Sequence, residues 1–102
     1  MRIHFERSGG FTGMRLGTTV DTGSLPAEKA QNLHDLVEAA NFFSLPASLQ
    51  SPGGGADRFQ YHISVEREDD SHTVEVSESA VPESLWPLLN QLMTMARSGP
   101  GA

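Results

Sequence analysis

The chain contains no cysteine. This excludes disulfide bonds and metal sites built from thiolates, and it is typical of a reducing compartment. No apolar run approaches the about 20 residues that a membrane-spanning helix needs. The N-terminal segment MRIHFERSGG also lacks the apolar stretch of a signal peptide. We therefore expect a cytoplasmic protein that has no signal peptide and does not bind membranes.

Positive charge is scarce as well. Seven lysines and arginines stand against 13 aspartates and glutamates, which gives a net charge of −6. Such a protein repels the phosphate backbone of nucleic acids and anionic lipid surfaces. We expect no nucleic-acid partner, and we expect the protein to be a monomer on its own.

Common catalytic motifs are missing from the sequence. It has no HExxH, no GxSxG, and no lysine after the glycines at 53–55 that would make a phosphate-binding loop. The four histidines are scattered, although His4 and His62 fall on the same polar strand face, where a metal pair is the alternative to two solvated side chains. We expect no catalytic residue, no metal site and no cofactor.

Alternating apolar and polar residues predict four strands. RIHFER (2–7) and MRLGTTV (14–20) flank the glycine-rich segment SGGFTG, and RFQYHISVE (58–66) and TVEVS (73–77) flank the acidic segment REDDSH. Two such runs around a short polar connection are typical of a β-hairpin. The sequence therefore predicts two hairpins.

Two further segments have the 3.6-residue period of amphipathic helices. The first begins near Pro26, ends near Asn41 and Pro46, and carries an apolar stripe. The second begins either at Pro82 or after a Ser84 cap, with Pro87 in its first turn. The segment 44–57 between the first helix and the third strand shows no period and is expected to be a long loop. The two stripes are Leu33, Leu36, Val37 and Ala40, and Leu85, Leu88, Leu89, Leu92 and Ala96.

These elements predict a two-layer α+β domain of order ββαββα. Each strand has a polar face, which indicates that both helices cover the same side of a four-stranded sheet. We assign residues 1–96 to one domain and expect residues 97–102 to be a disordered tail. The expected buried residues are Phe5, Leu36, Phe59, Ile63 and Leu89, and the expected exposed residues are His4, Gln60, His62 and Glu75.

The order of the elements also predicts a binding edge. If the first helix runs back along the sheet, the segments 8–13, 44–57 and 77–82 meet at one end of it. Loops gathered on a rigid scaffold are a common way to form a binding site. Phe11, between glycines, either packs into the end of the sheet or projects to anchor a partner; aromatic anchors contribute strongly to interfaces.

Several segments together resemble the emfourin family, the protealysin-associated inhibitors. They are GGFTG after the first strand, EAANFFSLP at the end of the helix, ADRFQYHISVE, and a proline-started last helix, in this order between about Ile3 and Met95. The resemblance implies a small bacterial protein that blocks thermolysin-like zinc metalloproteases and needs neither catalytic residues nor a cofactor. It does not say which residues touch the enzyme.

On this view the partner is a thermolysin-like protease, whose cleft would be occluded by the loop edge. Phe11, Leu45 and Leu49 are the apolar side chains that could fill a pocket of the cleft, and Asp57 and Glu78 could approach the zinc ion. Two alternatives stay open: an adaptor or immunity-type module that binds through the same edge without inhibiting, and a small enzyme. The full set of expected contact residues is Gly9, Gly10, Phe11, Thr12, Gly13, Leu45, Pro46, Leu49, Asp57, Glu78 and Val81.

Overall fold

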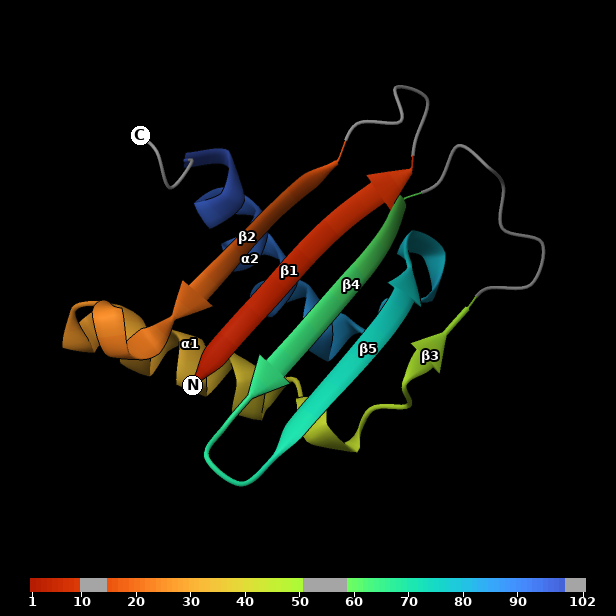
Figure 1. Ribbon diagram of the computed structural model, residues 1–102. Helices are drawn as coiled ribbons and strands as arrows, with labels where there is room; N and C mark the ends of the chain where they lie inside the picture. The colour runs from red at the N-terminus through yellow and green to blue at the C-terminus, as the bar shows by residue number, and fades with distance from the viewer. Residues whose placement is uncertain (10–14, 51–58, 99–102) are drawn as a thin grey trace.

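The computed structural model describes residues 1–9, 15–50 and 59–98. Within these residues, five strands form one sheet in the order β2-β1-β4-β5-β3 (Figure 1). All neighbouring strands are antiparallel except β3 and β5, which are parallel. The strands are β1 (Arg2–Gly9), β2 (Leu16–Asp21), β3 (Ser48–Leu49), β4 (Phe59–Glu66) and β5 (Ser71–Ser77).

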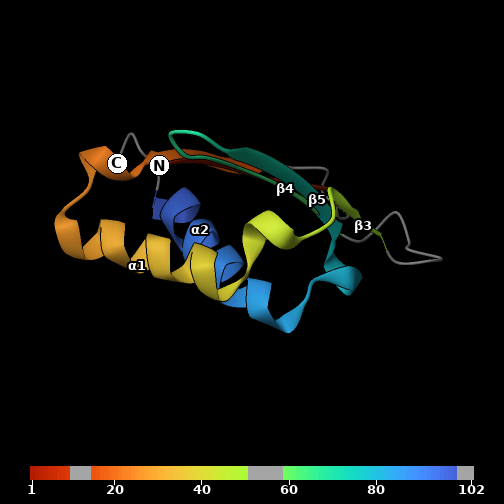
Figure 2. The same cartoon turned by 90° about the horizontal axis from the view of Figure 1, so that it is seen from below.

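The helices α1 (Ala27–Ala39) and α2 (Trp86–Ser98) both lie on one face of the sheet (Figure 2). The α+β class, the two hairpins β1–β2 and β4–β5, and the one-sided helix layer are thus confirmed. Short 3-10 helices join the main elements: η1 (Thr22–Ser24), η2 (Phe42–Ser44), η3 (Glu78–Ala80) and η4 (Glu83–Leu85).

The prediction of four strands was wrong, because part of the expected loop 44–57 forms β3. Ser48 pairs with Glu75 and Leu49 with Val76, and the Glu75 amide donates to the Ala47 carbonyl at 2.8 Å. Backbone hydrogen bonds pair this strand with β5. A strand of only 2 residues has no room for an alternating pattern, so the order is ββαβββα.

The predicted start and end of α1 agree with the structure. Pro26 directly precedes α1, and Asn41 follows its end in the left-handed conformation, with φ of 52°. Asparagine adopts that conformation more easily than most residues, which suits the residue that terminates a helix. Pro82 precedes η4 and Ser84 lies within it, whereas α2 itself begins at Trp86, with Pro87 in its first turn as expected. α2 continues to Ser98, beyond the expected domain boundary at residue 96.

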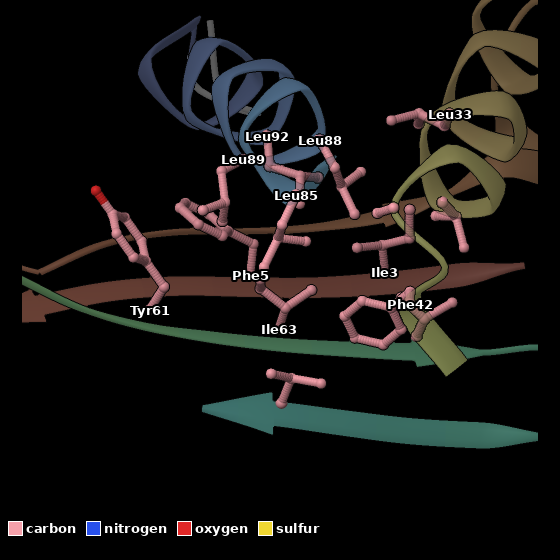
Figure 3. Close-up of a cluster of buried hydrophobic side chains, with 14 of the residues drawn as sticks. Ile3, Phe5, Leu33, Phe42, Tyr61, Ile63, Leu85, Leu88, Leu89 and Leu92 are labelled. Carbon is pink, nitrogen blue, oxygen red and sulfur yellow. The ribbon is translucent and has the colours of Figure 1, made fainter. Parts of the chain in front are cut away.

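One apolar core fills the space between the sheet and the helices (Figure 3). Phe5, Ile63 and Leu89 are fully buried in it, as predicted. Leu36 and Phe59 are only half-buried, so those two predictions were wrong. Leu33 and Val37 face the core from α1, which leaves Leu36 at the border of the helix stripe. Phe59 is the first residue of β4 and lies at the rim of the sheet.

The opposite face of the sheet carries the polar side chains. His4, Gln60 and Glu75 are exposed as predicted, whereas His62 is half-buried. On the strands that flank β4, Glu6 and Glu75 pair with His62. Residues of both neighbouring strands therefore cover His62. The alternating pattern along β4 alone does not predict this partial burial.

Candidate functional site

The sheet has two distinct ends. We call the end where β1 finishes and β4 begins the Phe59 end, and the end with the turn Arg67–Asp70 the Asp70 end (Figure 1). At the Phe59 end, Gly9 pairs with Phe59. The Phe59 amide also donates to the Glu78 Oε1 at 3.3 Å. The structure thus brings together two predicted site residues, Gly9 and Glu78, through the backbone of Phe59.

β3 carries a third segment toward the same end. Leu49, a predicted site residue, is half-buried and packs against the core beside Val76. The next residue, Gln50, accepts a hydrogen bond at its Oε1 from the Gln60 side chain at 3.3 Å. Because Gln60 follows Phe59 in β4, the end of β3 is tied to the Phe59 end.

Val81 belongs to the segment that leaves β5 at the Phe59 end. It follows η3 and is half-buried against the core. Its apolar side chain is therefore available only in part for a contact with another molecule. Val81 and Glu78 show that the predicted segment 77–82 does lie where the sequence placed it.

Leu45 and Pro46 do not join this group, which corrects the expected gathering of the whole segment 44–57. The Leu45 carbonyl accepts a hydrogen bond from the His72 Nε2 at 2.6 Å, and His72 lies at the start of β5, toward the Asp70 end. The cause is the path of α1, which runs across the strands near the Asp70 end rather than back along them (Figure 1). Within the segment 44–50, the chain therefore approaches the Phe59 end only at β3.

The remaining predicted site residues lie outside the described residues. They are Gly10, Phe11, Thr12, Gly13 and Asp57. The two alternatives for Phe11 therefore stay predictions. Its flanking strand residues, Gly9 and Leu16, are at the Phe59 end, because they pair with Phe59 and with Arg7.

An arginine–aromatic pair on the helix side of this end was missed in the sequence. The Arg7 guanidinium lies 4.2 Å from the centre of the Phe59 ring, a favourable cation–π geometry. Its Nη1 donates to the Met93 Sδ at 3.6 Å, while its Nε is buried without a hydrogen-bond partner among the described residues. The available signal was the alternation itself, since Arg7 continues the core-facing series of Ile3 and Phe5.

Tyr61 and Trp86 extend this pair along the helix side. Their rings meet edge to face, with centroids 6.2 Å apart, and the Tyr61 hydroxyl points away from the centre of the core (Figure 3). Burial raises the pKa of the Tyr61 hydroxyl above its usual 10.0, and the nearby Glu78 carboxylate raises it further. Half-buried Phe59 and Trp86 thus form an aromatic rim.

The open face at this end is hollowed. A depression of about 450 Å³ is lined by Glu6, Ser8, Gln50, Gln60, Tyr61, His62 and Glu75. The His62 Nδ1 lies 3.5 Å from the Glu75 Oε1, and the rings of His4 and His62 are 6.4 Å apart, as the shared strand face predicted. In the described parts of the chain, no three histidine or carboxylate side chains are grouped to hold a metal ion.

Aromatic residues and an arginine lie together at the Phe59 end. Both kinds of side chain are enriched in protein interfaces. Three segments distant in sequence, at the ends of β1, β3 and β5, contribute to this end. The arrangement can contact an extended partner over a broad area.

Comparison with known protein families gives a match over most of the chain. The sequence profile of the Emfourin family matches residues 5–93, whereas no curated protein and no solved structure matches the chain. Among the described residues, no helix is both long enough and apolar enough to cross a membrane. The matched range contains β1 from Phe5 onward, all of β2, β4, β5 and α1, and α2 up to Met93. The chain therefore belongs to the Emfourin family.

Proposed function

We propose that this protein inhibits thermolysin-like zinc metalloproteases by occluding the active-site cleft with the Phe59 end. Membership of the Emfourin family supports an inhibitory role. The observation that carries the proposal is the convergence of Gly9, Leu49 and Glu78 around one rim of the sheet. An inhibitor of this kind needs a rigid scaffold and a binding surface, and it needs no catalytic group.

The occlusion follows from how protease clefts bind. A cleft takes an extended peptide through backbone hydrogen bonds and side-chain pockets. Thermolysin-like enzymes favour large apolar residues after the scissile bond, as the family resemblance implies. We therefore assign Phe11, Leu49 and Val81 as apolar contacts, with Gly10, Thr12 and Gly13 beside them. We leave Leu45 and Pro46 out, because the bond from His72 holds Leu45 toward the Asp70 end.

The two carboxylates take different roles in this proposal. The Glu78 carboxylate already accepts the Phe59 amide, 3.3 Å away. We therefore assign Glu78 to positioning the start of β4. Asp57, just before that strand in the sequence, is the carboxylate that we propose could approach the zinc ion of the protease.

The decisive test is a titration of a purified thermolysin-like protease with this protein, followed by peptide cleavage. Cleavage should fall to a low plateau near an equimolar ratio. Two exposed residues at opposite ends of the sheet provide matched variants: Gln60→Arg places a long cation at the Phe59 end, and Asp69→Arg places the same side chain at the Asp70 end. Only Gln60→Arg should weaken inhibition.

The outcomes separate this proposal from the adaptor alternative. A protein that binds such proteases without slowing cleavage, or that leaves several of them uninhibited, is an adaptor rather than an inhibitor. If Asp69→Arg weakens inhibition and Gln60→Arg does not, the contact surface lies at the Asp70 end and the proposed assignment is wrong.

A further inference from the structure

The two edges of the sheet differ in how far another strand covers them. On one side, β3 covers part of β5. On the other side, β2 forms an edge of 6 residues that pairs only with β1 among the described strands. Natural proteins usually protect such an edge with charged residues, proline or a bulge. Residues 16–20 of β2 (LGTTV) contain neither charge nor proline.

The backbone groups that face this edge can be identified. Hydrogen-bonded and non-hydrogen-bonded pairs alternate along an antiparallel ladder. The Thr22 amide donates to the Met1 carbonyl at 2.9 Å, so the even-numbered residues of β2 direct their backbone groups to β1. Gly17 and Thr19 therefore direct their N–H and C=O groups outward. The Arg67–Asp70 and Glu75–Ala47 bonds fit the same alternation across the rest of the sheet.

We propose that the free edge of β2 pairs antiparallel with β2 of a second copy of this chain, about a two-fold axis at Thr18. In this register Gly17 lies opposite Thr19 of the second copy, and their outward groups form the new hydrogen bonds. The two sheets join into one continuous sheet. The expectation of a monomer did not take this strand edge into account. The proposed dimer does not depend on the proposed inhibitory function.

Charge complementarity selects this register. It places exposed Arg15 opposite exposed Asp21 of the second copy, once on each side of the axis. Opposite charges that face each other across antiparallel strands stabilise the pair, and like charges destabilise it. The strand is therefore self-complementary: uncharged in the middle, cationic at one end and anionic at the other.

An apolar hollow on the helix side of β2 fits the same arrangement. It has a volume of about 280 Å³ and lies beside the edge, lined by Thr18, Thr19, Val20, Asp21, Ser24, Leu25 and Met95. The register puts Leu16 of the second copy next to Val20 and against this hollow. Leu16, Leu25 and Met95 are each only half-buried in the single chain, so the dimer would cover apolar surface that is now exposed.

Sedimentation equilibrium from micromolar to millimolar concentration tests the dimer, since the single chain has a mass of 11.0 kDa. Thr19→Pro removes one outward N–H per copy and should weaken association at least tenfold. Thr19→Val is the matched control. It also loses the side-chain bond to His4 but keeps the N–H, so it should still dimerise. Arg15→Glu should weaken association several-fold by facing Asp21 of the second copy.

Circular dichroism and thermal unfolding would first establish that each variant is folded. A wild-type mass of 11.0 kDa at millimolar concentration would overturn the proposal. A dimer that both Thr19→Pro and Arg15→Glu leave intact would overturn it too. If Thr19→Pro weakens protease inhibition without changing the mass, the edge binds a strand of the protease instead of a second copy.

Discussion

Tyr61 is buried in the core, and its ring contacts the Trp86 ring. It is the only tyrosine of the chain, so phenolate absorbance reports on this one group. Its pKa is raised above 10.0, first by burial and then by the negative charge of Glu78. Both causes disfavour the phenolate, and both exist only in the folded protein.

This shift predicts a loss of stability at alkaline pH. Above pH 10 the unfolded chain releases the Tyr61 proton while the folded chain still holds it, so unfolding is favoured as the pH rises. The melting temperature of the wild type should therefore fall more steeply as the pH rises above about 10 than that of Tyr61→Phe. Parallel curves for the two proteins would contradict the shift.

Phe11 carries the most specific residue-level prediction about binding. Aromatic anchors at the centre of an interface often contribute about 2 kcal/mol or more, which is about a thirtyfold change in affinity. Phe11→Ala should weaken protease inhibition on that scale and leave the melting temperature unchanged. Asp69→Ala at the Asp70 end is the control and should change neither quantity. A lower melting temperature with full inhibition would assign Phe11 to the core instead.

At the scale of single elements, β3 depends on contacts outside its own 2 residues. The His72 ring packs against Phe42 and Phe43, with centroids 5.6 Å and 6.2 Å away. The same ring bonds to the Leu45 carbonyl. His72 thus holds Leu45 in place, and Leu45 begins the segment that leads to β3.

Hydrogen exchange can measure this dependence residue by residue. The Glu75 amide bonds to Ala47, whereas Val74 lies opposite Ile63 in the β4–β5 ladder. His72→Ala should speed exchange at Glu75 by up to roughly tenfold, the value of about one net hydrogen bond, and should leave Val74 protected. Equal acceleration at both amides would indicate a general loss of stability rather than release of β3.

The elements that sequence predicts well here are those with a local period. Both hairpins and both helices follow from alternation or from the spacing of leucines. β3 was missed because parallel backbone pairing leaves no pattern in 2 residues. The positions of Leu45 and Arg7 were missed for a related reason: they depend on how α1 crosses the sheet and on which residues cover a strand end. Those are relations between distant segments.

At the scale of the whole molecule, the apolar core should suffice for stability. The fully buried large side chains come from β1, β4, β5, both α-helices and the 3-10 helices η2 and η4, and the chain has no cysteine. A chelator such as EDTA should therefore leave the melting temperature unchanged. Recovery of a higher melting temperature on adding back one divalent metal would reveal a site that holds the fold together.

The position of β1 in the sheet bears on the order in which the protein folds. β1 lies between β2, which follows it closely in the sequence, and β4, where Ile3 pairs with Val65. Each hairpin closes a short loop, whereas joining β1 to β4 closes a much longer one, and long-range pairing slows folding. During synthesis, one edge of β1 in the first hairpin stays unpaired until β4 has left the ribosome. Joining of two preformed hairpins should therefore be the slow step, so Ile63→Val, which alters the β1–β4 junction opposite Phe5, should slow refolding.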